Sequence, residues 1–489
     1  MSDQTGQREV RLRKLEAMRE EGIDPFAATG YERTHRAGEL QRRFDELEGE
    51  TVAVAGRLTA LREHGRSAFA DLMDASGGVQ LFMRQNTLGE QRLAEFVELD
   101  IGDIVGARGT LMRTRTGEVS VEASQFEVLA KSLRPLPEKF HGLQDPELRY
   151  RQRYLDLIVN PDAREMLQKR SHMVARLRQA MSERGYTEFQ TPVLQPIYGG
   201  AHARPFTTYH NTLDMTLYLR IAPELYLKRL LVGGFERVYE IGPCFRNEGV
   251  DARHNPEFTM LEAYQAYADW EDMMELMQGL VVELAEAVCG GTSFTYREHE
   301  VDVTPPFRRV KLLHAVEEAT GVDFAALQTD EQAREACAEL DLGNTEADSW
   351  GTLLEKSFDR YVQPELVQPT FVTEYPTRLS PLAKRMRERP DTAYRFELFA
   401  GTEEIGNAFS ELNDPLDQRR RFEEQAAARE AGDAEAPPLD EDFVRALEHG
   451  MPPAGGMGMG VDRLAMLLLD APNLREVLAF PLLRPRDGD

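Results

Sequence analysis

The residues best suited to chemistry lie near the middle of the chain. Phe245–Glu248 (FRNE) sets a cation, an amide and a carboxylate side by side, between an expected strand at 237–241 and another at 257–264. A guanidinium can donate two parallel hydrogen bonds to a phosphate, and His254 and Phe258 can contact a purine ring. The same pattern fits a hairpin with a charged, solvated face, so this stretch alone leaves a nucleotide site as one of two interpretations.

Two further stretches carry features of the same kind. The segment 456–463 (GMGMGVDR) predicts a glycine-spaced strand that runs into an apolar helix at Arg463. A lone arginine at the start of such a helix needs an anionic partner if it is buried. The spaced glycines allow either the close approach of a ligand or close packing of helix on strand. The segment 184–194 predicts a helix end followed by a strand that contains a proline.

Taken in chain order, these three stretches resemble motifs 1, 2 and 3 of the class II aminoacyl-tRNA synthetases. Other segments resemble the bacterial lysyl-tRNA synthetases of subclass IIb, at 150–157 (YRQRYLDL), 221–230 (IAPELYLKRL) and 404–414 (EIGNAFSELND). The resemblance extends from about residue 50 to the C-terminus. A single glycine repeat would be a weak signal, whereas this ordered set is a specific one.

The elements that must position these residues predict an α+β protein. Residues 1–45 are highly charged and expected to be helical, and 46–135 contain five short alternating runs with a helical interval at 88–99. That pattern fits a small barrel of the OB or SH3-like kind, and the resemblance favours an OB-fold that binds an anticodon. By the same resemblance, 136–489 form a class II catalytic domain. We expect a mixed, mainly antiparallel sheet flanked by helices, with a helical insertion at about 308–370.

The composition excludes several classes of protein. The chain is 42% hydrophobic and 29% charged, which is typical of a soluble globular protein. It contains no apolar run near the roughly 18 residues that span a bilayer, and its start lacks the apolar segment of a secretory signal. The three cysteines are far apart, which excludes a thiolate zinc cluster and favours a reducing, cytoplasmic location. We therefore expect no membrane partner.

The net charge of −26 disfavours indiscriminate binding to nucleic acid, because an acidic surface repels polyanions. A tRNA partner would have to meet a local basic patch. One candidate is a cluster of basic residues near the N-terminus, although a solvated helix face explains the cluster equally well: Arg8, Arg11, Arg13, Lys14 and Arg19.

Activation of an amino acid by ATP depends on alignment and on neutralisation of phosphate charge more than on acid–base catalysis. The resemblance implies that Arg246 holds the α-phosphate and the lysine carboxylate, and that Arg463 holds the γ-phosphate; these are the expected catalytic residues. The implied ATP-binding residues are Arg246, Glu248, His254, Asn255, Phe258, Glu404, Ile405, Gly460 and Arg463. The implied lysine-binding residues are Gly200, Glu224, Arg246, Glu262, Tyr264, Asn407, Phe409 and Glu411.

The resemblance also implies Mg²⁺ as the cofactor, with Glu404 and Glu411 as its ligands. These residues are seven positions apart, so on a regular strand they would point to opposite faces. We therefore predict an irregular strand, with a bulge near Gly406 and Asn407 that resets the alternation. Their carboxyl groups should then lie within about 6 Å of each other, close enough to bind one ion or adjacent ions.

The side-chain pocket should suit a long aliphatic ammonium. Glu224 and Glu262, with Tyr264 and Phe409 as an aromatic wall, would accept lysine and repel the acidic substrate of an aspartyl-type relative. Glu224 also follows Pro223 at an expected helix start, where a carboxylate is favoured in any case. The alternatives are an aspartyl- or asparaginyl-type synthetase, a paralogue that lysylates a protein, and a nucleic-acid-binding protein with an inactive synthetase domain.

The partners implied by the resemblance are ATP, L-lysine, the tRNA for lysine and a second copy of the chain. The anticodon surface would comprise Phe69 and Gln80 on the barrel, with Glu118 on a nearby loop. Phe69 could stack on an unpaired base, or it could be part of the barrel core. The helix expected at about 163–184 leads into the proline-bearing strand, and in the family this segment forms the homodimer interface.

Overall fold

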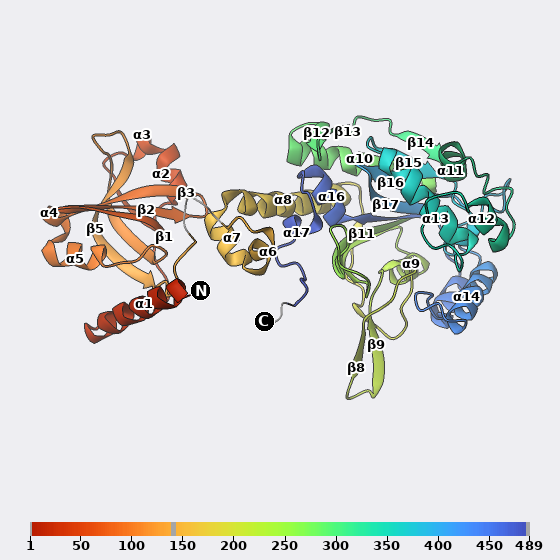
Figure 1. Cartoon of the computed structure of the whole chain (residues 1–489), viewed down its shortest axis with the longest axis horizontal. Coiled ribbons are helices and arrows are strands. Elements are labelled where there is room, and N and C mark those ends of the chain that lie inside the picture. Colours follow the sequence, from red (N-terminus) through yellow and green to blue (C-terminus); the bar gives the residue numbers. More distant parts are fainter. Residues whose placement is uncertain (1, 138–142, 486–489) are drawn as a thin grey trace. The chain divides into compact units, whose positions relative to one another are not determined.

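The structure is a computed structural model that describes residues 2–137 and 143–485. The chain divides into two compact units (Figure 1), which we call the N-terminal unit, Met1–Gln144, and the C-terminal unit, Asp145–Asp489. The N-terminal unit contains α1 (Ser2–Glu20), α2 (Ala37–Arg42), α3 (Phe44–Leu47), β1 (Thr51–His64), β2 (Ser67–Asp74), β3 (Gly77–Arg84), α4 (Gln85–Leu88), α5 (Glu90–Val97), β4 (Ile104–Arg113) and β5 (Val119–Ala130).

The strands of the N-terminal unit close into a barrel in the order β1-β2-β3-β5-β4. Strands β3 and β5 pair in parallel, and the other pairs are antiparallel. The predicted five-stranded OB-type barrel is thereby confirmed, and α4 and α5 occupy the expected helical interval. Gly109 lies at a register shift between β4 and β5, where a Cβ atom would collide with the backbone of Glu122 and Ala123.

The N-terminal helices pack on the barrel. Arg11 of α1 is buried, and its Nη1 donates to the carbonyl oxygens of Ser132 (2.9 Å) and Arg134 (3.1 Å). Lys14 donates to the carbonyl oxygen of Glu98 (2.8 Å) and pairs with Asp100 (3.2 Å). Two cations of the cluster considered as a tRNA-binding patch therefore serve this packing instead. Sequence reasoning could not detect this because their partners lie about 85 to 120 positions away.

The C-terminal unit is built on an eight-stranded sheet with the order β14-β15-β16-β17-β18-β11-β10-β6. The two outermost pairs, β14 with β15 and β10 with β6, are parallel, and the remaining pairs are antiparallel. The prediction of a mixed, mainly antiparallel sheet is confirmed. The strands are β6 (Thr187–Glu188), β10 (Arg237–Phe245), β11 (Glu257–Ala266), β14 (Arg308–Lys311), β15 (Thr370–Thr373), β16 (Arg395–Ala400), β17 (Glu403–Ser410) and β18 (Ala454–Gly460).

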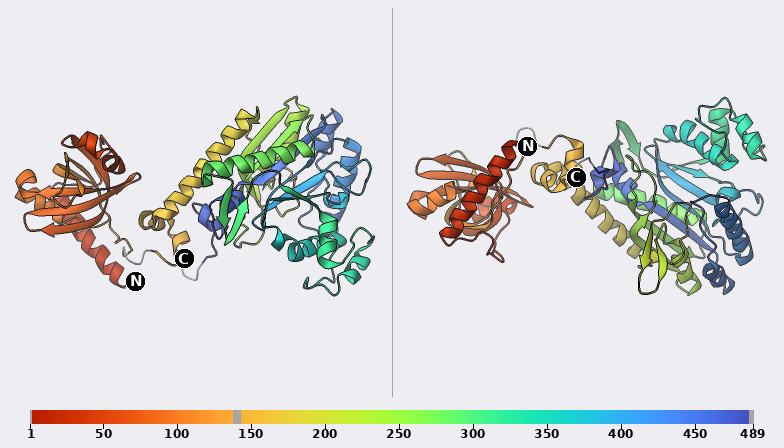
Figure 2. Two further views of the ribbon diagram at one scale, coloured as in Figure 1. Left: turned by 90° about the horizontal axis from the view of Figure 1, so that it is seen from above. Right: turned by 60° about the horizontal axis from the view of Figure 1, so that its bottom comes forward.

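Helices cover both faces of this sheet, and α8 and α10 lie side by side on one of them (Figure 2). No helix among residues 2–137 and 143–485 combines the length and the apolar character needed to cross a membrane. The C-terminal helices are α6 (Pro146–Arg151), α7 (Arg153–Val159), α8 (Pro161–Glu183), α9 (Glu224–Val232), α10 (Trp270–Cys289), α11 (Leu312–Thr320), α12 (Asp330–Ala336), α13 (Trp350–Tyr361), η1 (Gln363–Glu365), η2 (Thr377–Leu379), α14 (Pro415–Glu430), α15 (Glu441–Glu448), α16 (Val461–Leu468) and α17 (Leu474–Val477).

Two small sheets complete the C-terminal unit. One is the hairpin of β12 (Ser293–Tyr296) and β13 (His299–Asp302), and the other pairs β7 (Leu194–Gln195), β9 (Met215–Leu219) and β8 (Thr207–His210) in that order. The β8–β9 hairpin projects away from the body of the unit (Figure 1). The segment 308–370, expected to be a helical insertion, starts as the edge strand β14 before α11, α12 and α13 follow.

Strand β10 is longer than the sequence predicts. Gly242 and Pro243 were expected to follow its end at Ile241, but the strand continues through them to Phe245 in register with β11. Pro243 is tolerated because the neighbour on the other side, β6, pairs with Val238 and Tyr239 and does not reach it. The longer strand carries the chain directly to Arg246.

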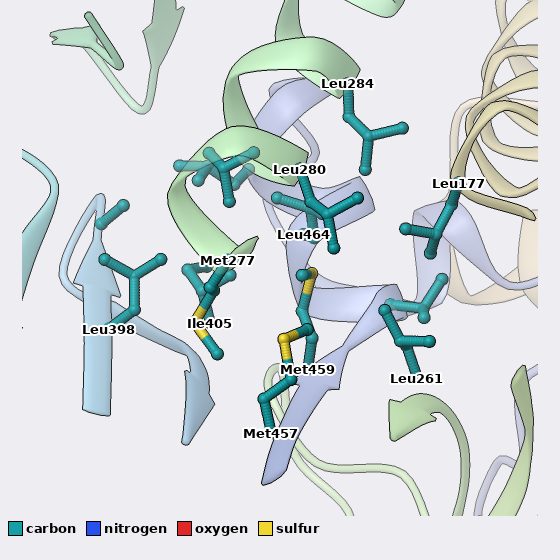
Figure 3. Packing of buried hydrophobic residues seen from close by; sticks show 14 of the residues in the cluster. Leu177, Leu261, Met277, Leu280, Leu284, Leu398, Ile405, Met457, Met459 and Leu464 are labelled. Atoms are coloured by element: carbon teal, nitrogen blue, oxygen red, sulfur yellow. The ribbon is translucent and has the colours of Figure 1, made fainter. Parts of the chain in front are cut away.

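The main core of the C-terminal unit depends on strand alternation. Leu261 on β11, Ile405 on β17, and Met457 and Met459 on β18 point toward α10 and α16 and pack against Leu280 and Leu464 (Figure 3). Successive residues of a strand point to opposite faces, so the intervening residues on these strands lie on the other side of the sheet. That other side carries the pocket described below.

We expect Leu464→Ala to destabilise the C-terminal unit by about 2–5 kcal/mol, because Leu464 is fully buried in this core and its truncation leaves a cavity. The shift of the denaturant midpoint, followed by tryptophan fluorescence, measures the loss. Leu416→Ala is the matched control, since the Leu416 side chain is 75% exposed and should change stability by no more than about 0.5 kcal/mol. Equal shifts for the two variants would contradict the core assignment.

Candidate active site

A pocket of about 410 Å³ opens on the face of the eight-stranded sheet opposite α10. It lies over β11, β17 and β18, where Glu262 and Asn407 alternate with the core residues Leu261 and Ala408. The residues predicted to bind ATP and lysine line this pocket, with the exception of Glu411: Gly200, Glu224, Arg246, Glu248, His254, Asn255, Phe258, Glu262, Tyr264, Glu404, Ile405, Asn407, Phe409, Gly460 and Arg463.

One end of the pocket is rich in cations. Arg463, in the first turn of α16, donates from Nη1 to Oε2 of Glu404 (2.8 Å), and its Nη2 lies 3.4 Å from Nε2 of His254. The guanidinium carbon of Arg246 lies 5.1 Å from the centre of the Phe258 ring. The Nε atom of Arg246 is buried and has no hydrogen-bond partner among the described residues. An anionic ligand is what these two guanidinium groups can bind.

The strand that carries Glu404 contains the predicted irregularity. Phe399 of β16 pairs with Glu404 and Leu398 pairs with Gly406, so Ile405 is an extra residue in β17. The bulge therefore lies one residue before the predicted position, Gly406 and Asn407. Its effect is the expected one, because Glu404 then shares the pocket face with Asn407 and Phe409.

The prediction that Glu404 and Glu411 hold one ion between them is wrong. At about 3.3 Å per residue, the Cα atoms of two residues seven positions apart on an extended chain are on the order of 20 Å apart. The two carboxyl groups accordingly have different partners, Arg463 for Glu404 and Lys228 for Glu411. Among the residues that the structure describes, no group of three or more acidic, histidine or cysteine side chains could hold a metal ion.

Glu404 alone keeps the chemistry that a phosphate-bound Mg²⁺ needs. Burial by itself would raise the pKa of this carboxyl group, but Arg463, Arg246 and Arg395 together bring the pKa below its ordinary value. Glu404 is therefore ionised, lines the pocket beside the arginines, and offers hard oxygen ligands. Glu411 belongs to the opposite end of the pocket.

That opposite end is a buried group of carboxylates and aromatic rings. Glu262 is 4% exposed, and its Oε2 accepts a hydrogen bond from the Tyr264 hydroxyl (2.9 Å). Burial raises the pKa of Glu262 to about 8, and the nearby Glu224 adds to this effect. Burial also raises the pKa of Glu411 to about 8, against the opposing effect of Lys228. Such a group of buried carboxylates favours a cationic ligand.

Sequence reasoning missed Lys228 in this group. It lies one turn after Glu224 on α9 and is fully buried, and its Nζ pairs with both Glu224 and Glu411. The available signal was a glutamate and a lysine four positions apart in an otherwise apolar helix. Such pairs are usually exposed, so the spacing alone did not place Lys228 in a pocket.

Sequence reasoning also missed Arg395, which orients Asn407. The Nε of Arg395 donates to Oδ1 of Asn407 (3.0 Å), and its Nη2 donates to Glu397 (2.7 Å). A guanidinium can only donate, so the Asn407 amide must present its oxygen to Arg395 and has its NH₂ group left for another acceptor. Asn407 lines the pocket, and an acceptor there is provided by a ligand such as a carboxylate.

The three residues predicted to contact an anticodon lie on the N-terminal unit. Phe69 and Gln80 share the outer face of β2 and β3, whereas Ala68, Ala70 and Leu81 point into the barrel core. The alternative that Phe69 is a core residue is therefore excluded. Phe69 stacks on Phe82 with ring centroids 4.6 Å apart and planes 7° apart. Gln80 accepts a hydrogen bond from Ser120 (2.9 Å), and the exposed Glu118 follows the turn between β4 and β5.

We expect Gly456→Ala to destabilise the C-terminal unit by about 1–3 kcal/mol, because a Cβ at Gly456 would overlap the Glu411 carboxylate and the Tyr264 ring. Thermal unfolding of the purified variant measures the change. Gly291→Ala is the control, since a Cβ at Gly291 meets no atom within 4 Å. An unchanged melting temperature in both variants would show that the carboxylate end of the pocket is looser than its contacts indicate.

Comparison with known proteins identifies the family. The description "tRNA synthetases class II (D, K and N)" matches residues 145–484, and "OB-fold nucleic acid binding domain" matches residues 52–129. Lysine–tRNA ligases of Carboxydothermus hydrogenoformans and Moorella thermoacetica are each 54% identical to this chain over 478 residues, which cover 98% of both chains. That of Syntrophomonas wolfei is 52% identical over 482 residues, 99% of this chain and 98% of its own. Family descriptions, identity and pocket together show that the chain belongs to the lysine–tRNA ligase family of class II tRNA synthetases.

Proposed function

We propose that the chain is a lysine–tRNA ligase that works in two steps. In the first step, a carboxylate oxygen of L-lysine attacks the α-phosphorus of ATP, the bond to the β-phosphate oxygen breaks, and pyrophosphate leaves. In the second step, a hydroxyl at the 3′ end of the tRNA attacks the carbonyl carbon of the adenylate, and AMP leaves. The observation that carries the proposal is the pocket itself, with guanidinium groups at one end and buried carboxylates at the other.

The cationic end would align and stabilise the phosphates. Arg246 has an unpaired Nε and stacks near Phe258, so it is placed to bind the α-phosphate beside an adenine ring held by Phe258. Arg463 would bind the γ-phosphate, with His254 next to it. Fixed cations stabilise the transition state because they need no rearrangement when charge develops on the phosphate oxygens. Mg²⁺ bound with ATP neutralises further phosphate charge, and Glu404 is the residue that we expect to hold it.

The carboxylate end would select lysine. Glu262, oriented by Tyr264, is the acceptor for the substrate ammonium, and Asn407 can donate its NH₂ group to the substrate carboxylate. An aspartate substrate would place a carboxylate beside Glu224 and Glu262, which disfavours the aspartyl-type alternative. A neutral side chain would leave Glu262 buried and unpaired, which costs free energy.

The N-terminal unit would bind the anticodon of the tRNA. Its outer face offers the stacked rings of Phe69 and Phe82 and the amide of Gln80, and these groups suit unpaired bases. A protein with an inactive synthetase domain would need no arginine, glutamate and asparagine side chains gathered in one pocket, so we favour the active enzyme over that alternative.

We also propose that two copies pair through the surface near α8 and β7. Apolar side chains are exposed on β7, on the residue before it, and on the β8–β9 hairpin: Val193, Leu194, Tyr209 and Leu213. The three free cysteines, Cys244, Cys289 and Cys337, are consistent with the reducing cytoplasm as the place of work. Sedimentation equilibrium of the full chain tests the dimer, and a monomer at micromolar concentration would contradict it.

The proposal is tested by lysine-dependent exchange of pyrophosphate into ATP, followed by charging of the tRNA for lysine. We expect exchange with L-lysine and none above background with L-aspartate. Exchange without charging would indicate a protein that activates lysine for another acceptor. Absence of both reactions would favour an inactive nucleic-acid-binding protein.

Glu262→Gln should lower kcat/KM for lysine in the exchange reaction by about 2–4 kcal/mol, or roughly 30- to 900-fold, because the substrate ammonium loses a charge-assisted bond. The KM for ATP should remain within about twofold, since Glu262 lies at the other end of the pocket. Glu275→Gln, an exposed position on α10, serves as the control. A Glu262→Gln enzyme with unaltered lysine dependence would disprove this assignment.

Phe69→Ala should weaken tRNA charging by about 1–3 kcal/mol, or roughly 5- to 150-fold in kcat/KM for tRNA, through the loss of one stacking contact. Lysine-dependent exchange should be unchanged because Phe69 lies in the other unit. Phe26→Ala removes another partly exposed ring from the same unit and should leave both reactions unchanged. A parallel loss of exchange and charging in Phe69→Ala would instead indicate damage to folding.

A further inference from the structure

The carboxylate end of the pocket already contains an ammonium group that the proposed reaction does not use. Lys228 extends from α9, and its side chain is fully buried. Its Nζ lies 2.5 Å from Oε1 of Glu224 and also pairs with Oε2 of Glu411. The same Nζ lies 5.3 Å from the ring centre of Phe409 and 5.9 Å from that of Tyr264.

These neighbours form the kind of site that an ammonium ligand needs, namely carboxylate oxygens and aromatic faces. The protein's own lysine therefore occupies two of the three carboxylates in this end of the pocket. The third, Glu262, is bonded to the Tyr264 hydroxyl and has no basic partner within hydrogen-bond distance among the described residues. A tyrosine hydroxyl orients a carboxylate without neutralising it.

We propose that Lys228 is a built-in counter-cation that reserves Glu262 for the substrate and thereby positions it. This inference rests on the proposed function, in which the substrate is L-lysine. With Glu224 and Glu411 held by Lys228, a bound ammonium finds one free carboxylate and one register. Without Lys228, three carboxylates compete for the substrate ammonium, and lysine can bind with its own carboxylate out of line with ATP.

The charges of the surrounding elements support this division. Burial alone would lower the pKa of Lys228, but Glu224 and Glu411 raise it above its ordinary value, so the group remains an ammonium. The other charged groups that act on the three carboxylates are Arg220 on Glu262, Arg395 on Glu224 and Lys384 next to Glu411. Among these residues, Lys228 is the one whose ammonium pairs directly with two of the carboxylates.

A purely structural ion pair is a weaker explanation. Burying an ion pair usually stabilises a fold no better than apolar side chains of the same size, because both ions lose their hydration. Nearby strand and helix positions are already filled by apolar residues, including Leu225, Leu227 and Leu231 on the same helix. Lys228 therefore has a charge for which the packing of α9 gives no reason.

The test uses the full-length enzyme in lysine-dependent exchange of pyrophosphate into ATP. For Lys228→Met, which keeps the side-chain length without the charge, we expect kcat to fall at least tenfold while KM for lysine stays within about threefold. KM for ATP should also stay within about threefold. Lys311→Met, which removes an exposed lysine paired with Glu374, is the matched control and should leave all three constants unchanged.

The double variant Lys228→Met with Glu411→Gln removes one ammonium and one carboxylate together. We expect it to recover at least threefold of the kcat lost in Lys228→Met, because fewer carboxylates then compete for the substrate. It also covers the case in which Lys228→Met does not fold. In that case, recovery of lysine-dependent exchange to within about tenfold of wild type supports the proposal.

Three results would overturn the proposal. The first is a Lys228→Met enzyme with wild-type constants. The second is a loss in which KM for lysine, KM for ATP and the melting temperature change together, which would indicate structural support alone. The third is a folded double variant with no gain over Lys228→Met. Wild-type exchange with lysine separates these failures from a failure of the proposed function, since a wild-type protein without such exchange would refute the function itself.

Discussion

The active site depends on the alternation of side chains across one sheet. Along β11, Leu261 and Ala263 enter the apolar core under α10, so Glu262 and Tyr264 must emerge on the other face. Strand β18 follows the same rule with glycines in place of the emerging side chains, and this creates room for the carboxylates of its neighbours. The extra residue Ile405 in β17 then brings Glu404 to the face of Asn407 and Phe409. A shift of one residue in any of these strands would exchange core and pocket side chains.

On this frame the pocket separates its charges into two ends. Arg246 and Arg463 gather at one end, and Glu224, Glu262 and Glu411 at the other. Each end is costly to bury alone, because neither set of charges is fully balanced by its own neighbours. A substrate with a carboxylate at one end and an ammonium at the other, bound with a polyphosphate, supplies the missing charges. The pocket is thus complementary to lysine and ATP bound together.

Internal arginine and lysine residues complete the arrangement. Arg395 determines which atom of Asn407 faces the pocket, and Lys228 occupies two of the three carboxylates at the ammonium end. On the N-terminal unit, alternation also places Phe69 and Gln80 outside the barrel, while Arg11 and Lys14 hold α1 against it. In this acidic protein, several basic residues that a sequence offers as ligands for a partner are instead internal fastenings. The surfaces left for nucleic acid are correspondingly local.

The sequence by itself determined the units, the barrel, the mainly antiparallel sheet and the pocket residues from Gly200 to Arg463, because these follow from short patterns whose members are neighbours in the chain. It also indicated the bulge in β17, since a spacing of seven cannot keep two residues on one face of a regular strand. Only the tertiary structure decided that Glu404 and Glu411 serve opposite ends, that β10 continues through Pro243, and that Lys228 and Arg395 belong to the site. Each of these outcomes depends on a partner more than ten positions away or on a neighbouring strand, or on whether a polar side chain is buried. Local patterns do not specify such distances, because they arise only when the strands and helices pack.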